Sequence, residues 1–133
     1  MKRVLVAEDY ESLRELLRYL LEQEQYEVHL AGDGYEAVGL MRQGVFDAVI
    51  TDWDMPRMNG LKFLALSRIM WPKTPIIIIS AEATPFPEGL PSGAFAWLNK
   101  PFRAEELLEV LRTAIWTTVH RHLEQSLTAT SQP

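Results

Sequence analysis

The sequence predicts a doubly wound α/β domain, in which helices cover both faces of a five-stranded parallel sheet. Two observations support this fold class. Short apolar runs rich in β-branched residues alternate with segments whose apolar residues recur at helical spacing. The chain of 133 residues is also long enough for one domain with a substantial core, and too short for two. Strands that alternate with helices in this way form parallel sheets through crossover connections.

The first part of the chain contains three expected strands with a helix after each of the first two. We expect strands at 3–7, 28–31 and 46–51, because each is a short apolar run bounded by charged or turn-forming residues. A helix is expected at 34–44, with Gly44 as its C-cap. The first helix is indicated by leucines at the i, i+3, i+4, i+7 and i+8 spacing of an amphipathic helix, namely Leu13, Leu16, Leu17, Leu20 and Leu21.

The second part continues the alternation. We expect a helix at 60–70, which must end before Pro72, and strands at 75–80 and 94–99. Four consecutive isoleucines make 75–80 typical of a strand that is buried on both faces. The last helix is expected from 103 to about 124, which is longer than coverage of a sheet requires.

One segment, 84–93, interrupts the pattern where a fourth helix belongs. Its sequence TPFPEGLPSG contains Pro85, Pro87 and Pro91. A proline removes a backbone donor and clashes with the preceding turn of a helix. We therefore expect a Pro/Gly-rich loop in place of a regular fourth helix, or at most a single helical turn around 87–91.

Composition excludes several classes of protein. The formal net charge is −5 and the Lys and Arg residues are scattered, so we expect no direct nucleic-acid binding by this segment. The chain has no cysteine, which excludes disulfides, thiol catalysis and Cys-ligated metal sites. No apolar run approaches the length of a membrane span, and the N-terminus does not resemble a signal peptide. We therefore expect no membrane association and a cytoplasmic location.

Charged or hydroxyl side chains lie at the ends of four of the expected strands, at one edge of the sheet. Glu8 and Asp9 come after the first strand, Asp52 after the third, Ser80 at the end of the fourth and Lys100 after the fifth. Ligands of open α/β sheets bind outside the carboxyl ends of the strands, so we expect these side chains to converge. Two carboxylates about 4 Å apart repel by roughly 4 kcal/mol at an effective dielectric of about 20. Raised pKa values or a bound cation must compensate for this repulsion.

An all-oxygen set of ligands with open positions suits Mg²⁺, with Mn²⁺ or another divalent ion as a substitute. A carboxylate that lies beside such an ion and beside the Lys100 ammonium is arranged to accept a phosphoryl group as an aspartyl phosphate. The transfer requires little covalent assistance, because positioning and charge neutralisation supply most of the rate. The sequence therefore predicts a phosphoryl-accepting site at this edge.

Four stretches in order, LVAEDY, AVITDWDMPRMNG, IIIISAEA and WLNKPF, resemble the receiver domains of two-component response regulators. The resemblance runs from about residue 3 to residue 119. It implies a flavodoxin-like sheet with the strand order 2-1-3-4-5, from which this chain departs at its degenerate fourth helix. We accordingly expect a receiver domain at 1–119, and at 120–133 an extension of the last helix that ends in a polar, disordered tail from 126.

The resemblance implies roles for the acidic residues. Asp52 matches the phosphoacceptor of the family. Glu8 and Asp9 match the residues that hold Mg²⁺ together with the phosphoacceptor, and the backbone carbonyl of Asp54 matches a further ligand. The Asp54 side chain is expected to face solvent near the mouth of the pocket.

The resemblance also implies how phosphorylation is reported. Ser80 matches the hydroxyl that binds a phosphoryl oxygen, and Lys100 matches the ammonium that pairs with another. Trp97 matches the aromatic residue that switches together with Ser80. Lys100–Pro101 matches the cis peptide of the family. Because receivers report through a face that includes the fourth helix, the departure at 84–93 puts the usual pairing through that face in doubt.

The function implied by the resemblance is a phosphoacceptor receiver that takes a phosphoryl group from a phosphohistidine onto Asp52. The donor is a sensor histidine kinase or a histidine phosphotransfer protein, and the output is a downstream effector protein or effector domain. Such a receiver catalyses its own phosphorylation and slow dephosphorylation without being a conventional metabolic enzyme. Two alternatives stay open: a degenerate receiver that acts only as a protein-binding module, and an aspartyl-phosphate phosphohydrolase with Asp54 as its second acid, although the chain has no room for a cap.

Several residues also have ordinary structural interpretations. Glu8 and Asp9 alone could cap a helix, with Asp9 at the N-cap. Trp97 alone could simply pack in the core. The last helix beyond about residue 118 could be a frayed end, a linker to an effector domain or a helix used for pairing.

Overall fold

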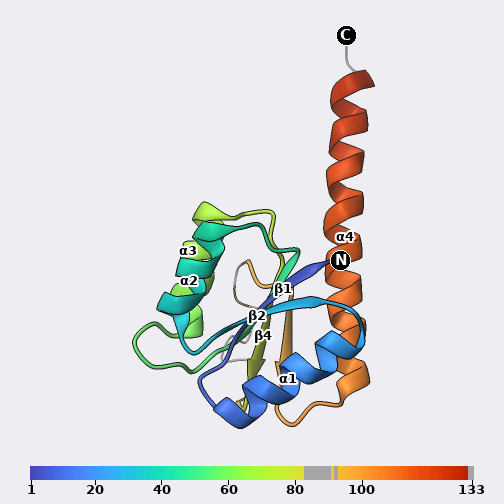
Figure 1. Ribbon diagram of the computed structural model, residues 1–133. Helices are drawn as coiled ribbons and strands as arrows, with labels where there is room; N and C mark the ends of the chain where they lie inside the picture. Colours follow the sequence, from blue (N-terminus) through green and yellow to red (C-terminus); the bar gives the residue numbers. More distant parts are fainter. Residues whose placement is uncertain (83–90, 92, 132–133) are drawn as a thin grey trace.

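A computed structural model of the chain describes residues 1–82, 91 and 93–131. Five strands form one parallel sheet in the order β2-β1-β3-β4-β5, which is the order that the family resemblance implies (Figure 1). The strands are β1 (Arg3–Ala7), β2 (Glu27–Ala31), β3 (Ala48–Asp52), β4 (Ile76–Ser80) and β5 (Ala96–Asn99). The described helices are α1 (Glu11–Gln23), α2 (Gly34–Gln43), α3 (Gly60–Met70) and α4 (Ala104–Ser131). The fold class is therefore confirmed.

Two apolar layers attach the helices to the sheet, one on each face. Side chains alternate between the faces along a strand, so Val4 and Val6 contribute to one layer and Leu5 to the other. The first layer includes buried residues of α1 and α4, and the second includes buried residues of α2 and α3 (Figure 1). All residues of β3 and β4 are buried. Coverage on both faces explains why their sequences are continuous apolar runs.

The observed bounds agree with the predicted ones to within two residues for most elements. The strand expected at 46–51 begins at Ala48 and ends at Asp52, which is buried. In α1, Leu17 and Leu21 are fully buried, whereas Leu16 is 51% exposed, because it points about 100° away from Leu17 around the helix. Gly44 is the C-cap of α2, as predicted, although its backbone is extended rather than left-handed.

The last helix, α4, is longer than predicted. It runs from Ala104 to Ser131, so the segment from 126 that was expected to be disordered is helical through Ser131, and residues 132–133 lie outside the described residues. Leu107, Leu111, Ala114 and Ile115 are buried against the sheet. Beyond them the helix projects from the domain (Figure 1). The domain boundary near residue 119 stays a prediction.

The connection between β4 and β5 contains no helix among its described residues, 81–82, 91 and 93–95. The prediction of a loop or a single helical turn within 84–93 falls mostly on residues 83–90 and 92, which lie outside the described part of the chain. None of the helices that the structure describes is both long enough and apolar enough to cross a membrane.

An ion pair joins the start of α2 to the connection between β3 and α3. Asp33 is the N-cap of α2, and its Oδ1 accepts a hydrogen bond from the backbone N–H of Glu36 at 2.9 Å. Its Oδ2 accepts a hydrogen bond from Nε of Arg57 at 2.7 Å. Burial alone would raise the pKa of Asp33, but the hydrogen bonds from Glu36 and Arg57 outweigh burial and hold this pKa below its ordinary value.

Asp33→Asn should lower the free energy of unfolding by about 1 kcal/mol at pH 7, because the amide keeps the cap acceptor but loses the charge opposite the exposed Arg57. A depressed carboxyl pKa gives stability that is present above the unfolded-state pKa, near pH 4, and is lost as the pH falls through the folded-state value. The difference between the two proteins should therefore shrink at pH 3. Urea unfolding at both pH values measures it, with the exposed Glu109→Gln as the charge control. Equal urea midpoints for wild type and Asp33→Asn at pH 7 would contradict the prediction.

Candidate functional site

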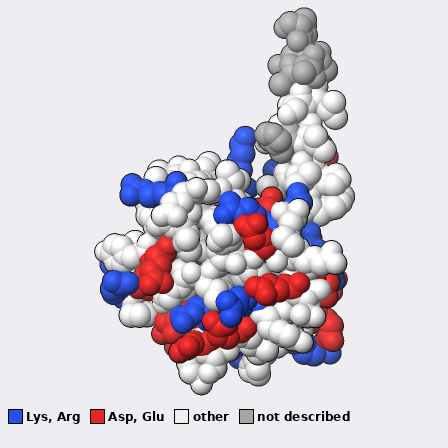
Figure 2. All heavy atoms as spheres, viewed as in Figure 1, with Lys and Arg blue, Asp and Glu red and all other residues white. Residues whose placement is uncertain are grey.

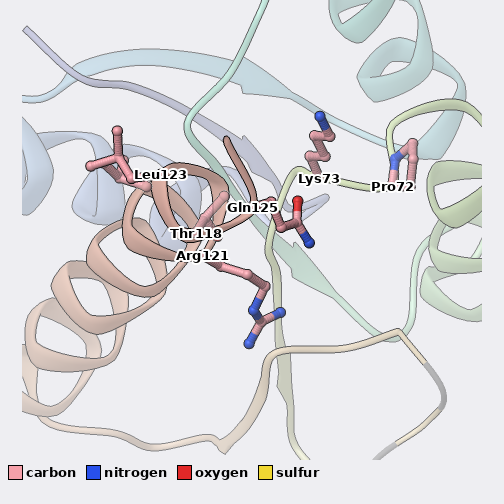
Figure 3. A pocket seen from close by; sticks show the side chains of 7 residues that line it. Pro72, Lys73, Thr118, Arg121, Leu123 and Gln125 are labelled. Carbon is pink, nitrogen blue, oxygen red and sulfur yellow. The ribbon is translucent and has the colours of Figure 1, made fainter. Parts of the chain in front are cut away.

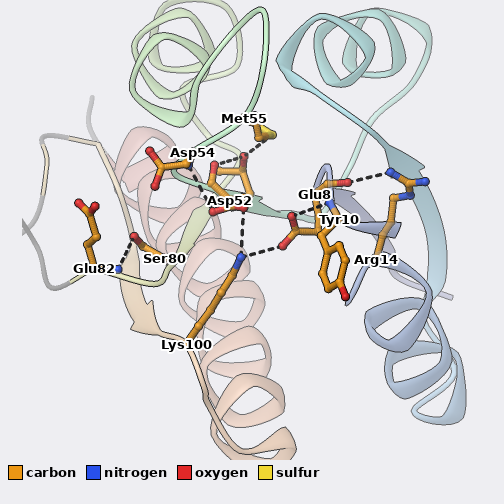
Figure 4. A network of polar contacts seen from close by, with 10 residues as sticks. Glu8, Tyr10, Arg14, Asp52, Asp54, Met55, Ser80, Glu82 and Lys100 are labelled. Carbon is orange, nitrogen blue, oxygen red and sulfur yellow. Dashed lines mark hydrogen bonds and ion pairs between the residues drawn. The ribbon is translucent and has the colours of Figure 1, made fainter. Parts of the chain in front are cut away.

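The carboxyl edge of the sheet brings the predicted site residues together (Figure 4). Asp52 ends β3 and Ser80 ends β4, while Glu8 directly follows β1 and Lys100 directly follows β5. Nζ of Lys100 donates to Oε1 of Glu8 at 2.9 Å and to Oδ2 of Asp52 at 3.1 Å. One ammonium group therefore bridges two carboxylates that come from different strands.

A third carboxylate completes an acidic cluster. Glu8, Asp9 and Asp52 each place one oxygen within 4.8 Å of the others. Glu8 is fully buried and Asp52 is 5% exposed, whereas Asp9 lies on the surface. A cleft of about 480 Å³ opens beside Asp9 and is lined also by Asp54 and Asn59. The cluster is therefore closed on the side of the sheet and accessible from solvent through Asp9.

The cluster contains more negatively charged groups than positively charged ones. Burial raises the pKa of Glu8 to about 7, and the charge of Asp52 adds to this effect, while hydrogen bonds from Lys100 and from the Tyr10 N–H oppose it. Burial lowers the pKa of Lys100, but its hydrogen bonds to Glu8 and Asp52 outweigh burial and leave this pKa raised. Lys100 therefore stays an ammonium group at neutral pH. With all three carboxylates ionised, one positive charge faces three negative charges.

This donor set fits a hard divalent cation. All the available ligand atoms are carboxylate oxygens, and one side of the cluster faces solvent, where an ion could keep its waters. The backbone N–H of Asp54 donates a hydrogen bond to Oδ1 of Asp52 at 3.3 Å, and this bond holds Asp54 close to the cluster. The Asp54 side chain is exposed, as expected. That the Asp54 carbonyl is a ligand stays a prediction.

A second network lies between β4 and β5. Ser80 is buried, and its Oγ accepts a hydrogen bond from the backbone N–H of Glu82 at 3.1 Å. The carbonyl of Glu82 accepts hydrogen bonds from Nε1 of Trp97 at 3.2 Å and from Nδ2 of Asn99 at 2.6 Å. The sequence analysis missed Glu82 and Asn99. Only the spacing of Trp97 and Asn99, two apart on one face of a strand, could have indicated that they act on the same partner.

Trp97 has a structural role that is compatible with a switch. It is half-buried, and its ring lies 4.9 Å from the ring of Trp53 at an interplanar angle of 56°. Trp53 directly follows Asp52 in the chain, so the aromatic pair adjoins the acidic cluster. Trp97 thus packs against another aromatic side chain, as its structural interpretation expects. That it also acts as a switch stays a prediction.

The helix-capping interpretation of Asp9 is wrong. The N-cap of α1 is Tyr10, and no side chain makes a cap hydrogen bond there. Instead, Arg14 of α1 contacts the backbone that precedes the helix: its NH1 donates a hydrogen bond to the Glu8 carbonyl at 3.0 Å. The sequence gives no signal for this contact of Arg14. The Lys100–Pro101 peptide bond is cis, as the family resemblance implies.

A family model described as the response regulator receiver domain matches residues 4–112. The chain belongs to this family. This receiver domain is 37% identical over 112 residues to the transcriptional regulatory protein DltR of Streptococcus agalactiae serotype III (strain NEM316), which covers 83% of this chain and 50% of DltR. It is 38% identical over 118 residues to the response regulator MprA of Mycobacterium sp. (strain KMS), which covers 87% of this chain and 51% of MprA.

Solved structures agree with this assignment. The receiver domain is similar to the response regulator protein TrrA of Thermotoga maritima in complex with Mg²⁺-BeF, with a TM-score of 0.78 and 34% sequence identity. The match covers 86% of this chain and 99% of the TrrA chain. In contrast, the chain spans about half the length of the curated relatives DltR and MprA. The receiver domain is therefore the part that these regulators share with it.

The backbone at Asp52 depends on one glycine. A Cβ atom at Gly60 would lie 2.6 Å from the carbonyl oxygen of Asp52 and 2.7 Å from Cα of Trp53. Both contacts are with backbone, which cannot rotate away as a flexible side chain can. The first turn of α3 can therefore approach the end of β3 only if residue 60 has no side chain.

Gly60→Ala should lower the free energy of unfolding by about 1–3 kcal/mol, because the backbone of Asp52 and Trp53 must shift to admit the methyl group. Gly39→Ala in α2 is the matched control, since a Cβ there meets nothing within 4 Å. In a helix interior that change should instead raise stability by about 0.5–1 kcal/mol. Urea unfolding measures both. Effects of the same sign in the two variants would contradict the role of Gly60.

Proposed function

We propose that this receiver domain accepts a phosphoryl group on Asp52 from a phosphohistidine, and that the modified state controls an output. The observation that carries the proposal is the ammonium of Lys100, held at 3.1 Å from Asp52 and 2.9 Å from Glu8 within a cluster of three carboxylates. A purely structural ion pair would need no third carboxylate at its open side. An acidic site that admits a dianion does need cations on both sides of it.

In the proposed reaction, one carboxylate oxygen of Asp52 attacks phosphorus while the phosphorus–nitrogen bond of the phosphohistidine breaks. The bonding electron pair stays on the imidazole nitrogen, which takes up a proton and leaves as neutral histidine. Lys100 keeps the Asp52 carboxylate in place before the reaction and neutralises a phosphoryl oxygen after it. The cleft beside Asp9 and Asp54 is the route by which the donor residue approaches.

We propose Glu8, Asp9 and Asp52 as the residues that hold Mg²⁺, with the backbone carbonyl of Asp54 as a further ligand. The ion would supply positive charge to the equatorial phosphoryl oxygens. The oxygen-only donor set supports this assignment. The similarity to TrrA, whose structure is a complex with Mg²⁺-BeF, supports it as well.

The proposed switch follows from the network at β4 and β5. A phosphoryl oxygen on Asp52 competes for Ser80 Oγ, which in this structure accepts the N–H of Glu82. Movement of Glu82 would in turn change the partner shared by Trp97 and Asn99. The switch pair Ser80 and Trp97 would therefore be coupled through the backbone of Glu82.

The proposed partners of this receiver domain follow from the chemistry of phosphoryl transfer and from the family to which the chain belongs. The phosphoryl donor would be a sensor histidine kinase or a histidine phosphotransfer protein, and the output would be an effector protein or effector domain. DltR is called a transcriptional regulatory protein and is about twice the length of the match. The domain would be a catalyst of its own phosphorylation and slow dephosphorylation, working in the cytoplasm.

Incubation with phosphoramidate and Mg²⁺ should produce one phosphorylated species, which separates from the unmodified protein on a phosphate-affinity gel. Asp52→Asn should abolish it, because the amide is not a nucleophile. Asp54→Asn is the matched control and should keep the phosphorylated band, because its side chain lies in solvent. Rapid multiple turnover of a phosphate monoester would favour a phosphohydrolase instead. A folded wild-type protein that gains no phosphate would favour a degenerate protein-binding module.

Mg²⁺ should raise the melting temperature of the wild-type protein by roughly 5 °C at ten times its Kd, because a ligand that binds only the folded state stabilises it. Asp9→Asn should lose most of this increase, since it removes one of three carboxylate ligands. Asp54→Asn should retain it if only the carbonyl of Asp54 binds the ion. Differential scanning calorimetry with and without EDTA measures the shift. An equal increase in all three proteins would assign it to a different site.

A further inference from the structure

The C-terminal half of α4 leaves the domain at the edge of the sheet opposite the acidic cluster. The helix begins at Ala104, four residues after Lys100, and runs back along the sheet (Figure 1). Its inner face ends at Ala114 and Ile115, which are buried. From Trp116 onward the described side chains are exposed or only partly buried. This half of the helix therefore presents a surface that does not form part of the domain core.

Four exposed side chains form a stripe along this projecting half. They occur at intervals of four, three and four residues, and the three apolar ones are 60%, 53% and 69% exposed in chain order: Trp116, His120, Leu123 and Leu127. We call this set the outer stripe. At about 100° per residue it lies on the side of the helix roughly opposite the buried inner face. The Trp116 and His120 rings stack with centroids 3.8 Å apart, which adds to the continuity of the stripe.

The same side of α4 changes character where the helix leaves the domain. Toward the N-terminus it carries the exposed charged residues Glu105, Glu109 and Arg112. From Trp116 onward it is mainly apolar, and in Figure 2 the projecting end of the helix is largely free of charged atoms where it is described, whereas acids and bases mix over the domain below. A helix face that only meets water would stay polar along its length. Exposed apolar residues confined to the projecting part indicate an interaction there.

The side of the projecting helix that faces its own domain borders a cleft. This cleft, of about 480 Å³, separates the helix from the connection from α3 to β4 and is lined by Pro72, Lys73, Thr118, Val119, Arg121, Leu123 and Gln125. Figure 3 shows Leu123 on the other side of the helix from Gln125 and Lys73. Leu123 of the outer stripe reaches the rim of this cleft, whereas Trp116, His120 and Leu127 do not line it.

We propose that the outer stripe pairs with the outer stripe of a second copy of this chain as a short parallel coiled coil. Intervals of four and three residues are those of the core positions of a coiled coil. The flanking positions fit self-pairing, because Glu124 would face Val119 of the second copy rather than another acid. An antiparallel pair with the two stripes aligned would instead place the end of one helix opposite the charged Arg112 of the other.

The available area predicts a weak dimer. The exposed parts of the stripe amount to about 400 Å² of apolar surface per chain, roughly half of the ~800 Å² per partner that stable interfaces bury. Pairing should therefore be reversible. Because the stripe and the acidic cluster lie at opposite edges of the sheet, pairing leaves the cleft beside Asp9 open. The inference does not depend on phosphorylation of Asp52.

Sedimentation velocity from about 5 to about 500 μM should show the wild-type protein rising from monomer toward dimer. Leu123→Glu should weaken this association at least tenfold, because two acids then face each other in the core of the pair. Gln125→Glu is the matched control, with the same new side chain on the other side of the same helix, and should associate as wild type does. A wild-type protein that stays monomeric throughout, or equal loss in both variants, would overturn the proposal.

Orientation is tested by cysteine substitution, since the chain has no cysteine of its own. In a parallel pair, Leu127→Cys brings two thiols together at the same level of both helices, within the Cα separation that a disulfide allows. Mild oxidation should then yield a covalent dimer of Leu127→Cys and little of Gln125→Cys. Circular dichroism confirms that both remain folded. A dimeric wild type whose Leu127→Cys variant does not cross-link, or cross-links no faster than Gln125→Cys, would refute the parallel arrangement.

Discussion

Repulsion among carboxylates at one edge of the sheet is the constraint on which the site depends. Glu8 is fully buried next to Asp52, and its burial, with the charge of Asp52 adding to the effect, raises the pKa of Glu8 to about 7 even though Lys100 donates a hydrogen bond to it. A fold selected only for stability would replace such a cluster with apolar residues of similar size. The arrangement makes chemical sense when further positive charge enters at the open side. Such positive charge is what the proposed cation would supply to the cluster.

The sheet supplies the rigidity that this cluster needs. β1, β3 and β4 are buried on both faces by α1 and α4 on one side and by α2 and α3 on the other. In parallel register, Val6 lies beside Ile50 and Asp52 lies beside Ile79. Neighbouring strands therefore end at nearly the same level, and the residues that follow them meet. Packing of the apolar interior fixes the positions of the strands, and this in turn fixes the positions of the polar residues at the strand ends.

These same strands explain what the sequence could and could not predict. Buried strands leave a strong signal, such as the four isoleucines of β4, and from the strand ends the convergence of Glu8, Asp52 and Lys100 follows by topology. Contacts made by one flexible side chain with a distant backbone leave no periodic signal. The bond from Arg14 to the Glu8 carbonyl is of this kind. The sharing of the Glu82 carbonyl left only the two-residue spacing of Trp97 and Asn99, which does not identify their partner. The length of α4 was underestimated because a polar tail resembles a disordered one, although Ser and Thr also occur in helices.

The two faces of α4 relate the acidic cluster to the outer stripe. Leu107 and Leu111 attach the first half of the helix to the sheet just after Lys100, and Trp116 begins the exposed half only five residues beyond Leu111. Because one continuous helix carries both, a movement of its first half would rotate or translate the stripe as a rigid unit. Thermodynamic linkage makes this coupling reciprocal. Pairing of the stripes could therefore affect the acidic cluster only if it favoured one position of α4. A weak pair is suited to this, since a large interface would hold α4 in place and leave the cluster no influence over it.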